Sequence, residues 1–176
     1  MICRLLLPLL SLTVDAIVFK SDLHANPRAW RCKELSASEK GAIGAASFTK
    51  SRNASHIDHV SAVGATGLRK AMEADNVLVV FWHPGCPSCN VYCADGNSPL
   101  ESIHDSFAEE NGPRVLKYNL FWYPLPNDFD TGEATIQVPR LQLANKTGVV
   151  GSPFWGNFYD YAALKAWVIG NGMMAA

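Results

Sequence analysis

The sequence lacks the features that mark a nucleotide- or nucleic-acid-binding protein. It has no long basic run, no glycine-rich phosphate loop and no internal repeat, and its formal net charge is only -1 at pH 7. So small a net charge builds in no electrostatic attraction for nucleic acid or acidic lipid. The sequence also shows no Ser/His/Asp set or paired carboxylates at a spacing that would indicate a hydrolase. We therefore expect no nucleic-acid partner and no hydrolytic function.

The sequence does have enough apolar material for one packed domain. Hydrophobic residues make up 48%, aromatic residues 10% and charged residues 18% of the 176 residues. These values are ordinary for a globular protein, and the length allows one domain with a terminal extension. We expect residues 55–172 to form that domain, behind a signal segment over residues 1–16 and an N-terminal extension or linker over residues 17–54.

The first residues are typical of a secretory signal peptide. Met1-Ile2-Cys3-Arg4 is short and positive, an apolar run follows, and Val14-Asp15-Ala16 offers small residues for cleavage. The apolar run is short for a membrane span, and Asp15 and Lys20 close it off. We favour cleavage, which predicts location in the lumen of the secretory pathway or outside the cell. The alternative is a retained signal anchor, and only then would the protein associate with a membrane.

The extension over residues 17–54 is rich in Ala, Ser, Lys and Arg and shows little sustained periodicity. We interpret it as a linker or as an arm packed on the domain surface. The alternative is a second targeting element behind the signal peptide, which would direct the protein to a plastid or thylakoid. A short helix is expected over residues 36–46, weakened by Gly41 and Gly44.

The domain shows an order of elements that predicts an α/β fold. The expected strands cover residues 56–60, 77–82, 114–120 and 141–143, with a hairpin turn at 145–148 and a return strand from 149; the expected helices cover residues 61–74, a segment from 86, 100–110 and 159–169. Ser61 is expected to cap the first of these helices. This order predicts a central mixed β-sheet flanked by helices on both faces.

A Cys-x-x-Cys motif, Cys86-Pro87-Ser88-Cys89, follows the expected buried strand and opens a helix. Unpaired backbone N–H groups and the helix dipole at such a position favour negative charge, which lowers the pKa of the first thiol. Cys86 is then expected to be the nucleophilic thiolate. Cys89 lies one turn later, where it can resolve a mixed disulfide.

Over residues 57–169 the sequence resembles the thioredoxin superfamily. The resemblance is carried by residues 77–89, which join the apolar strand to the motif, and by Val138-Pro139-Arg140-Leu141 downstream. It implies a thioredoxin-like or protein disulfide isomerase-like domain in which Pro139 is a cis-proline packed beside the disulfide. It also implies that Val138 offers backbone hydrogen bonds to an extended substrate segment.

Three features depart from the pattern of the superfamily. Thioredoxins usually carry a buried acid in the strand before the motif, and the matching position here is Val80 or Val79. Many members have Trp immediately before the first cysteine, where this sequence has Gly85. The dipeptide Pro87-Ser88 between the cysteines is neither Gly-Pro nor Gly-His. These departures leave the expected fold intact and weaken the expectation of fast turnover.

Three further residues are candidate modulators of the motif. A protonated His83 would stabilise the Cys86 thiolate, although an exposed turn histidine is the simpler interpretation. Ser88 can donate a weak hydrogen bond to that thiolate. Cys93 is a candidate third redox thiol or a disulfide partner for Cys32, and an inert buried thiol is the alternative.

A metal site is the remaining alternative for these residues. His83, Cys86, Cys89 and Cys93 are ligand types used by zinc and iron–sulfur clusters. No second Cys-x-x-Cys or Cys/His pair follows to complete such a site. We therefore expect no metal and no other cofactor.

Two functions follow from these observations. The first is a thiol–disulfide oxidoreductase that acts on protein thiols and disulfides. The second is a non-catalytic thioredoxin-like accessory or structural subunit of a larger protein assembly, in which the motif is vestigial. An open groove beside Cys86 and Pro139 favours the first, whereas an N-terminal arm that covers Cys86 favours the second.

Overall fold

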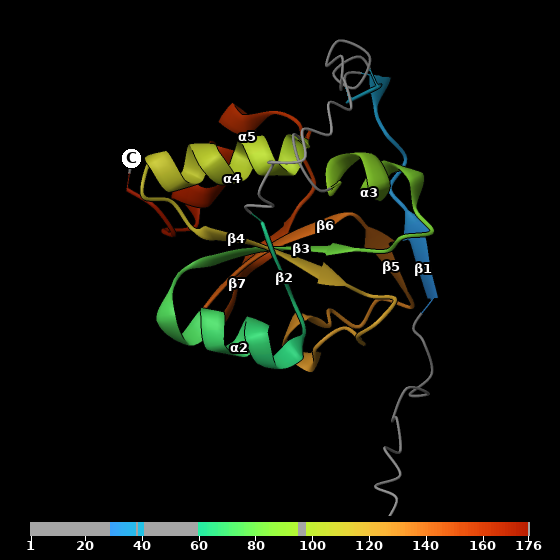
Figure 1. The fold of residues 1–176 in the computed structure, drawn as a ribbon, viewed down its shortest axis with the longest axis horizontal. Coiled ribbons are helices and arrows are strands. Elements are labelled where there is room, and N and C mark those ends of the chain that lie inside the picture. The colour runs from blue at the N-terminus through green and yellow to red at the C-terminus, as the bar shows by residue number, and fades with distance from the viewer. Residues whose placement is uncertain (1–28, 38, 41–59, 95–97, 176) are drawn as a thin grey trace, which may run out of the picture.

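A five-stranded mixed sheet forms the centre of the protein in a computed structural model, which describes residues 29–37, 39–40, 60–94 and 98–175 (Figure 1). Across the sheet the strands are β2 (Ser61–Val63), β4 (Arg114–Asn119), β3 (Val77–Trp82), β6 (Arg140–Asn145) and β7 (Gly148–Phe154). Strands β2 and β3 run parallel to β4, while β6 is antiparallel to both β3 and β7. The predicted mixed sheet is confirmed.

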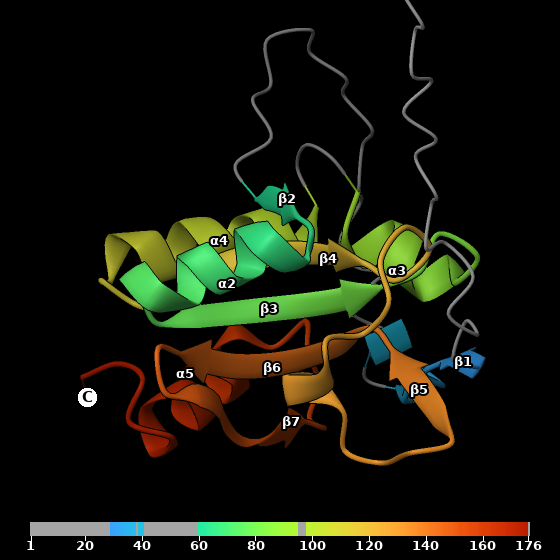
Figure 2. The same cartoon turned by 90° about the horizontal axis from the view of Figure 1, so that it is seen from below.

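Helices cover both faces of this sheet, as the order of elements predicted. Helices α4 (Pro99–Glu109) and α5 (Tyr161–Gly170) lie on one face, and α2 (Ala65–Ala74) lies on the other (Figures 1 and 2). The short helix α3 (Pro87–Tyr92) follows the end of β3, and the one-turn helix η1 (Asn127–Phe129) lies in the long loop after β4. The fold is therefore a three-layer α/β arrangement.

Strand β3 is buried on both faces because each of its sides packs into a different part of the core. Leu78 and Val80 belong to the cluster that includes residues of α4 and α5. Val77, Val79 and Phe81 belong to the cluster that includes residues of α2. The unbroken apolar run of β3 is what a central strand between two layers of helices requires.

The start of the first domain helix differs from its prediction. Ser61 does not cap a helix, because residues Ser61–Val63 form strand β2, in which Ser61 lies opposite Leu116. Helix α2 begins only at Ala65, after Gly64. Pairing with β4 gives the backbone of these three residues hydrogen-bond partners, so tertiary pairing outweighs the local helix signal. Of the strand expected over residues 56–60, residues 56–59 lie outside the described residues.

A second, two-stranded sheet pairs β1 (Ala29–Cys32) with β5 (Thr135–Val138) in parallel. The sequence analysis predicted neither strand. Figures 1 and 2 show this small sheet beside α3. After β1 the chain becomes helical at Ala37, Glu39 and Lys40. We call residues 29–37 and 39–40 the arm.

Several expectations concern residues outside the described ranges. These are the signal segment over residues 1–16 and residues 17–28, 38 and 41–54 of the extension, which include residues 38 and 41–46 of the helix expected over residues 36–46. Within the part of the chain that the structure describes, no helix has both the length and the apolar character needed to cross a membrane.

Because β3 is buried on both faces, a Val-to-Ala substitution there is expected to lower the free energy of unfolding more than the same substitution at the surface. Val79→Ala removes two methyl groups from a side chain that is fully buried, which costs about 2 kcal/mol of unfolding free energy. Val91→Ala alters an exposed position on α3 and costs less than about 0.5 kcal/mol. Urea denaturation of the two variants, both with disulfides intact, measures the difference. Equal losses would contradict the assigned core.

Candidate redox site

The turn between β3 and α3 positions Cys86 as the first residue of the site. Cys86 is the N-cap of α3, with Pro87 in the first turn. The backbone N–H of Cys86 donates to the carbonyl of His83 (3.0 Å), and the side-chain amide of Asn90 donates to the carbonyl of Pro84 (2.9 Å). Proline suits the first turn of a helix because its missing N–H has no partner there. The turn is thus fixed by local bonds at both of its ends.

Cys86 forms a disulfide with Cys32 of the arm, and the two Cα atoms are 5.4 Å apart. Cys89 and Cys93 are buried and keep their thiols. The suggested pairing of Cys32 with Cys93 is therefore wrong, and the bond within the Cys86-x-x-Cys89 motif is not formed. The register of the small sheet explains this, because it places Cys32 opposite Val138, beside the motif.

Val138 packs in the same cluster as Cys86, and the peptide bond between Val138 and Pro139 is cis. The carbonyl of Val138 accepts a hydrogen bond from the backbone N–H of Lys33 (2.6 Å). The Sγ atom of Cys86 is 3.7 Å from the same carbonyl oxygen, which is a contact rather than a hydrogen bond because a disulfide sulfur carries no proton. The substrate-binding role of Val138 and Pro139 stays a prediction, and the backbone group on which it depends is occupied by the arm.

Cys89 packs in the same small cluster as Cys86, Ile136 and Val138. Burial raises the pKa of the Cys89 thiol to about 12, and backbone hydrogen bonds at His83 and at Cys89 itself oppose this shift only in part. A thiol in this environment is protonated at neutral pH. Cys89 is therefore a weak nucleophile for as long as the site stays closed.

Trp30 is the residue of this site that the sequence analysis missed. Its indole stacks on the ring of His83, with 3.9 Å between the ring centroids and 23° between the planes. A Cβ atom built on Gly85 would lie 3.0 Å from the indole, so Gly85 leaves room for it. The arm thus brings a tryptophan next to the position before the first cysteine, where many thioredoxins carry their own. The alternation Trp30-Arg31-Cys32 is the only sequence signal that pointed to a strand here.

His83 is held as a neutral ring. Burial lowers its pKa, and its Nδ1 atom accepts a hydrogen bond from the backbone N–H of Gly85 (3.0 Å). A proton on Nδ1 would remove that bond. The geometry therefore favours a packing role for His83 over the charged, thiolate-stabilising role considered from the sequence.

The other two candidate modulators lie in different surroundings. The hydroxyl of Ser88 lies 3.2 Å from the Sγ atom of Cys86 and is the donor, since the sulfur is in a disulfide. Cys93 is the C-cap of α3 and packs in the main core with Tyr92 and Leu100 rather than with Cys86. Val80, at the position of the usual buried acid, is itself fully buried.

Comparison with solved structures identifies the fold of this chain. No family model matches the sequence, and no curated protein matches it. Solved structures do match: the first thioredoxin domain of mouse protein disulfide-isomerase A4 shares 18% identity and a TM-score of 0.50 over 65% of this chain and 76% of that one. The chain has a thioredoxin-like fold. The zinc-bound form of human ERp44 is similar at 15% identity and a TM-score of 0.50 over 64% of this chain and 30% of that one.

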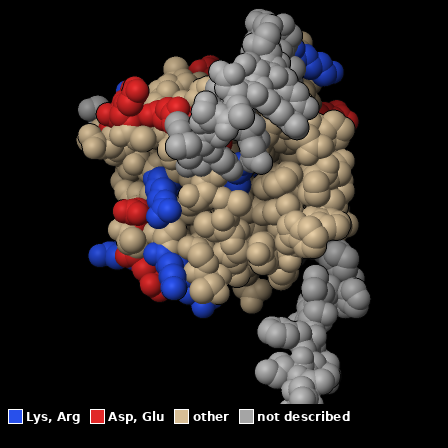
Figure 3. All heavy atoms as spheres, viewed as in Figure 1, with Lys and Arg blue, Asp and Glu red and all other residues tan. Residues whose placement is uncertain are grey.

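Two groups of exposed aromatic side chains lie on this thioredoxin-like domain. Phe121, Trp122 and Tyr123 in the loop after β4 are 55%, 61% and 44% exposed, and Trp155 is 50% exposed. Phe121 lies edge-on to His83, with ring centroids 5.8 Å apart, so the first group adjoins the site. Figure 3 shows charged side chains gathered on the side of α2 and α4, whereas the part of this face over β5 carries few. The surroundings of the site on this face therefore carry few charged side chains.

The thioredoxin-like site offers no metal centre in the described ranges. No group of three or more His, Cys, Asp or Glu side chains there is placed to hold a metal ion. Cys86 is committed to its disulfide, and Cys93 lies in the main core. His83, Cys86, Cys89 and Cys93 are therefore not assembled as a ligand set.

The raised pKa of Cys89 predicts slow alkylation in the folded protein. At pH 8 a thiol with a pKa of about 12 is roughly one ten-thousandth thiolate, so iodoacetamide reacts with it about 10³-fold more slowly than with an ordinary thiol. The rate rises with pH towards about 12, because the thiolate is the reactive form. Peptide mass mapping with the unfolded protein as the reference measures the rate. Reaction of Cys89 at the rate of the unfolded protein would contradict its assigned environment.

Proposed function

We propose that this protein is a thiol–disulfide oxidoreductase that acts on protein substrates, with Cys86 as the nucleophile and Cys89 as the resolving cysteine. The observation that carries the proposal is the disulfide of Cys86, which lies between α3 and the cis Val138–Pro139 bond with the Cys89 thiol in the same cluster. Cys86 therefore already forms a disulfide with a separate segment of the chain, the arm. The thioredoxin-like fold is consistent with this function and does not by itself establish it.

The reaction proceeds through two thiol–disulfide exchanges. The Cys86 thiolate attacks one sulfur of a substrate disulfide, so that a mixed disulfide forms and the other substrate sulfur leaves as a thiolate. Cys89, after losing its proton, attacks the Sγ atom of Cys86, which forms the Cys86–Cys89 bond and releases the second substrate thiolate. An external dithiol restores the two thiols, and the same steps run backwards when the protein acts as an oxidant. The direction of electron flow is set by the reduction potential of the site relative to its compartment.

We further propose that the protein works in an oxidising compartment reached through the secretory pathway. The signal-like residues 1–16 and the Cys32–Cys86 disulfide both support this location, because structural disulfides persist in such compartments. Location in a plastid, or anchoring to a membrane through residues 1–16, is the alternative.

A non-catalytic accessory subunit is the second candidate, and one observation favours it. Cys86 is fully buried, and the arm lies across it. If that disulfide is static, the protein has no exchangeable thiol at this position, and the exposed aromatic loop Phe121–Tyr123 would instead contact an assembly partner. The two candidates differ in whether the Cys32–Cys86 bond opens to a dithiol.

Reduction of a model protein disulfide by dithiothreitol separates the two candidates. The full chain is expected to accelerate the reaction, and Cys86→Ser is expected to return it to the rate of dithiothreitol alone because the nucleophile is lost. Cys89→Ser is expected to accumulate a mixed disulfide between Cys86 and the substrate. The control variant is Val91→Ala, at an exposed position of α3, and circular dichroism confirms that each variant is folded. Equal rates for the full chain and Cys86→Ser would support the accessory role instead.

A further inference from the structure

We propose that the arm is a tethered substrate, in which Cys32 forms with Cys86 the mixed disulfide that a protein substrate would form. This inference rests on the proposed function and specifies its substrate class. The recognised substrate is an extended segment with an aromatic residue two positions before its cysteine. Four sets of contacts support the proposal.

The first is the strand alternation of β1. Trp30 and Cys32 are half-buried and point towards the site, whereas Ala29 and Arg31 are exposed. Alternate residues of a strand face the same side, so a segment that presents its cysteine to Cys86 also presents the residue two positions earlier. Trp30 and Cys32 both pack against the cluster that contains Cys86 and Cys89. The arm is therefore docked as an extended peptide with two inward side chains.

The second is the surface that receives Trp30. The ring of His83 lies parallel to the indole, and Gly85 has no side chain to block it. Stacking of this kind contributes about 0.5–1.5 kcal/mol beyond the burial of apolar area. Phe121 lies edge-on to the same His83 ring and extends the aromatic surface. The surface formed by His83, Gly85 and Phe121 thus selects an aromatic side chain.

The third is the backbone pairing of the arm. Strand β1 is in parallel register with β5, and Cys32 lies opposite Val138. The backbone N–H of the next residue, Lys33, donates to the Val138 carbonyl. Main-chain bonds of this kind add affinity without requiring a particular sequence, while inward side chains supply the selectivity. Any substrate that uses the Val138 carbonyl must first displace Lys33.

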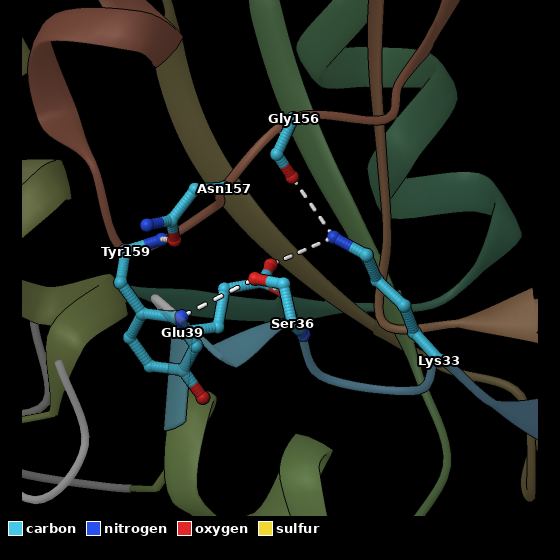
Figure 4. Close-up of polar contacts among 6 residues, drawn as sticks. All are labelled: Lys33, Ser36, Glu39, Gly156, Asn157 and Tyr159. Atoms are coloured by element: carbon cyan, nitrogen blue, oxygen red, sulfur yellow. Dashed lines mark hydrogen bonds and ion pairs between the residues drawn. The ribbon is translucent and has the colours of Figure 1, made fainter. Parts of the chain in front are cut away.

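The fourth is a polar clamp that holds the arm beyond its cysteine (Figure 4). The Nζ atom of Lys33 donates to Glu39 and to the carbonyl of Gly156, both at 2.8 Å, and lies 4.4 Å from the ring centre of Phe158. Ser36 and Glu39 bond reciprocally: the Ser36 backbone N–H donates to the carboxylate (2.8 Å), and the Ser36 hydroxyl accepts from the Glu39 backbone N–H (3.3 Å).

Glu39 keeps its charge at neutral pH, so the polar clamp persists whether or not the disulfide is formed. Burial raises the pKa of Glu39, but hydrogen bonds from Lys33 and Ser36 outweigh burial and leave the pKa below its ordinary value. The carboxylate therefore stays ionised at neutral pH. Because the clamp does not involve sulfur, an arm whose disulfide opens stays near the site at a high effective concentration.

The exchange that opens the arm needs no outside reagent. Deprotonated Cys89 attacks the Sγ atom of Cys86, the Cys86–Cys89 bond forms, and the Cys32–Cys86 bond breaks. Cys32 leaves as a thiolate and takes up a proton, which balances the proton that Cys89 gave up to solvent. The number of disulfides and thiols is unchanged. Burial of Cys89 keeps this exchange slow while the arm is docked.

Equilibration with a mixture of reduced and oxidised glutathione tests the docking directly. In a Cys89→Ser background, acid quenching and mass mapping give the fraction of molecules with the Cys32–Cys86 bond. Trp30→Ala is expected to lower the equilibrium constant for this bond about tenfold, since the stacking on His83 is lost. Arg31→Ala, on the exposed side of the same strand, is expected to change it less than about twofold. Equal effects of the two substitutions would overturn the proposal.

Steady-state kinetics test the competition with substrate. Cys32→Ser is expected to lower the KM for a model protein disulfide about fivefold or more while kcat is unchanged, because an arm held only by its noncovalent contacts competes less strongly with substrate than one bonded to Cys86. An active wild-type protein whose KM does not respond to Cys32→Ser would overturn the inference and leave the proposed function standing. Absence of turnover in both proteins, together with the Trp30 effect on the glutathione equilibrium, would count against the proposed function alone.

Discussion

The disulfide between Cys32 and Cys86 is the covalent constraint that holds the arm on the redox site. It joins two segments that are 54 residues apart in sequence. A loop of this length corresponds to about 4 kcal/mol of stabilisation in the chain-entropy account of disulfides. In the bonded state β1 pairs with β5, Cys86 is buried and Trp30 stacks on His83. Without the disulfide, the contacts of the arm are noncovalent and open to exchange with another extended segment.

The remainder of the domain provides a rigid support for this bond. Strand β3 is packed from both sides by helices, and Cys86 follows it after a turn with hydrogen bonds at both ends. Strand β6 pairs with β3, so that Pro139, directly before β6, is held beside the turn. The two parts of the site come from distant segments, and the sheet fixes their separation. Chemistry that requires two sulfurs and one backbone carbonyl to meet benefits from such rigid positioning.

The sequence was most informative where local patterns decide the structure. The apolar run 77–82, the motif at Cys86 and the turn at residues 145–148 each carry a signal within a few residues, and each lies in the predicted type of element. The arm carries only the short alternation Trp30-Arg31-Cys32, because β1 depends on pairing with β5, about a hundred positions later in the chain. The same reason explains Ser61, whose strand depends on β4 rather than on its neighbours. The partner of Cys86 could not be predicted because cysteine spacing does not determine connectivity.

Peptide mapping of the full, unreduced chain measures directly which cysteine is bonded to Cys86. Digestion after trapping of thiols at low pH, followed by mass spectrometry, distinguishes the possible pairings. The expected result is a peptide containing Cys32 linked to the peptide containing Cys86, with Cys89 recovered as a blocked thiol. A bond between Cys86 and Cys89, with Cys32 recovered as a thiol, would contradict it.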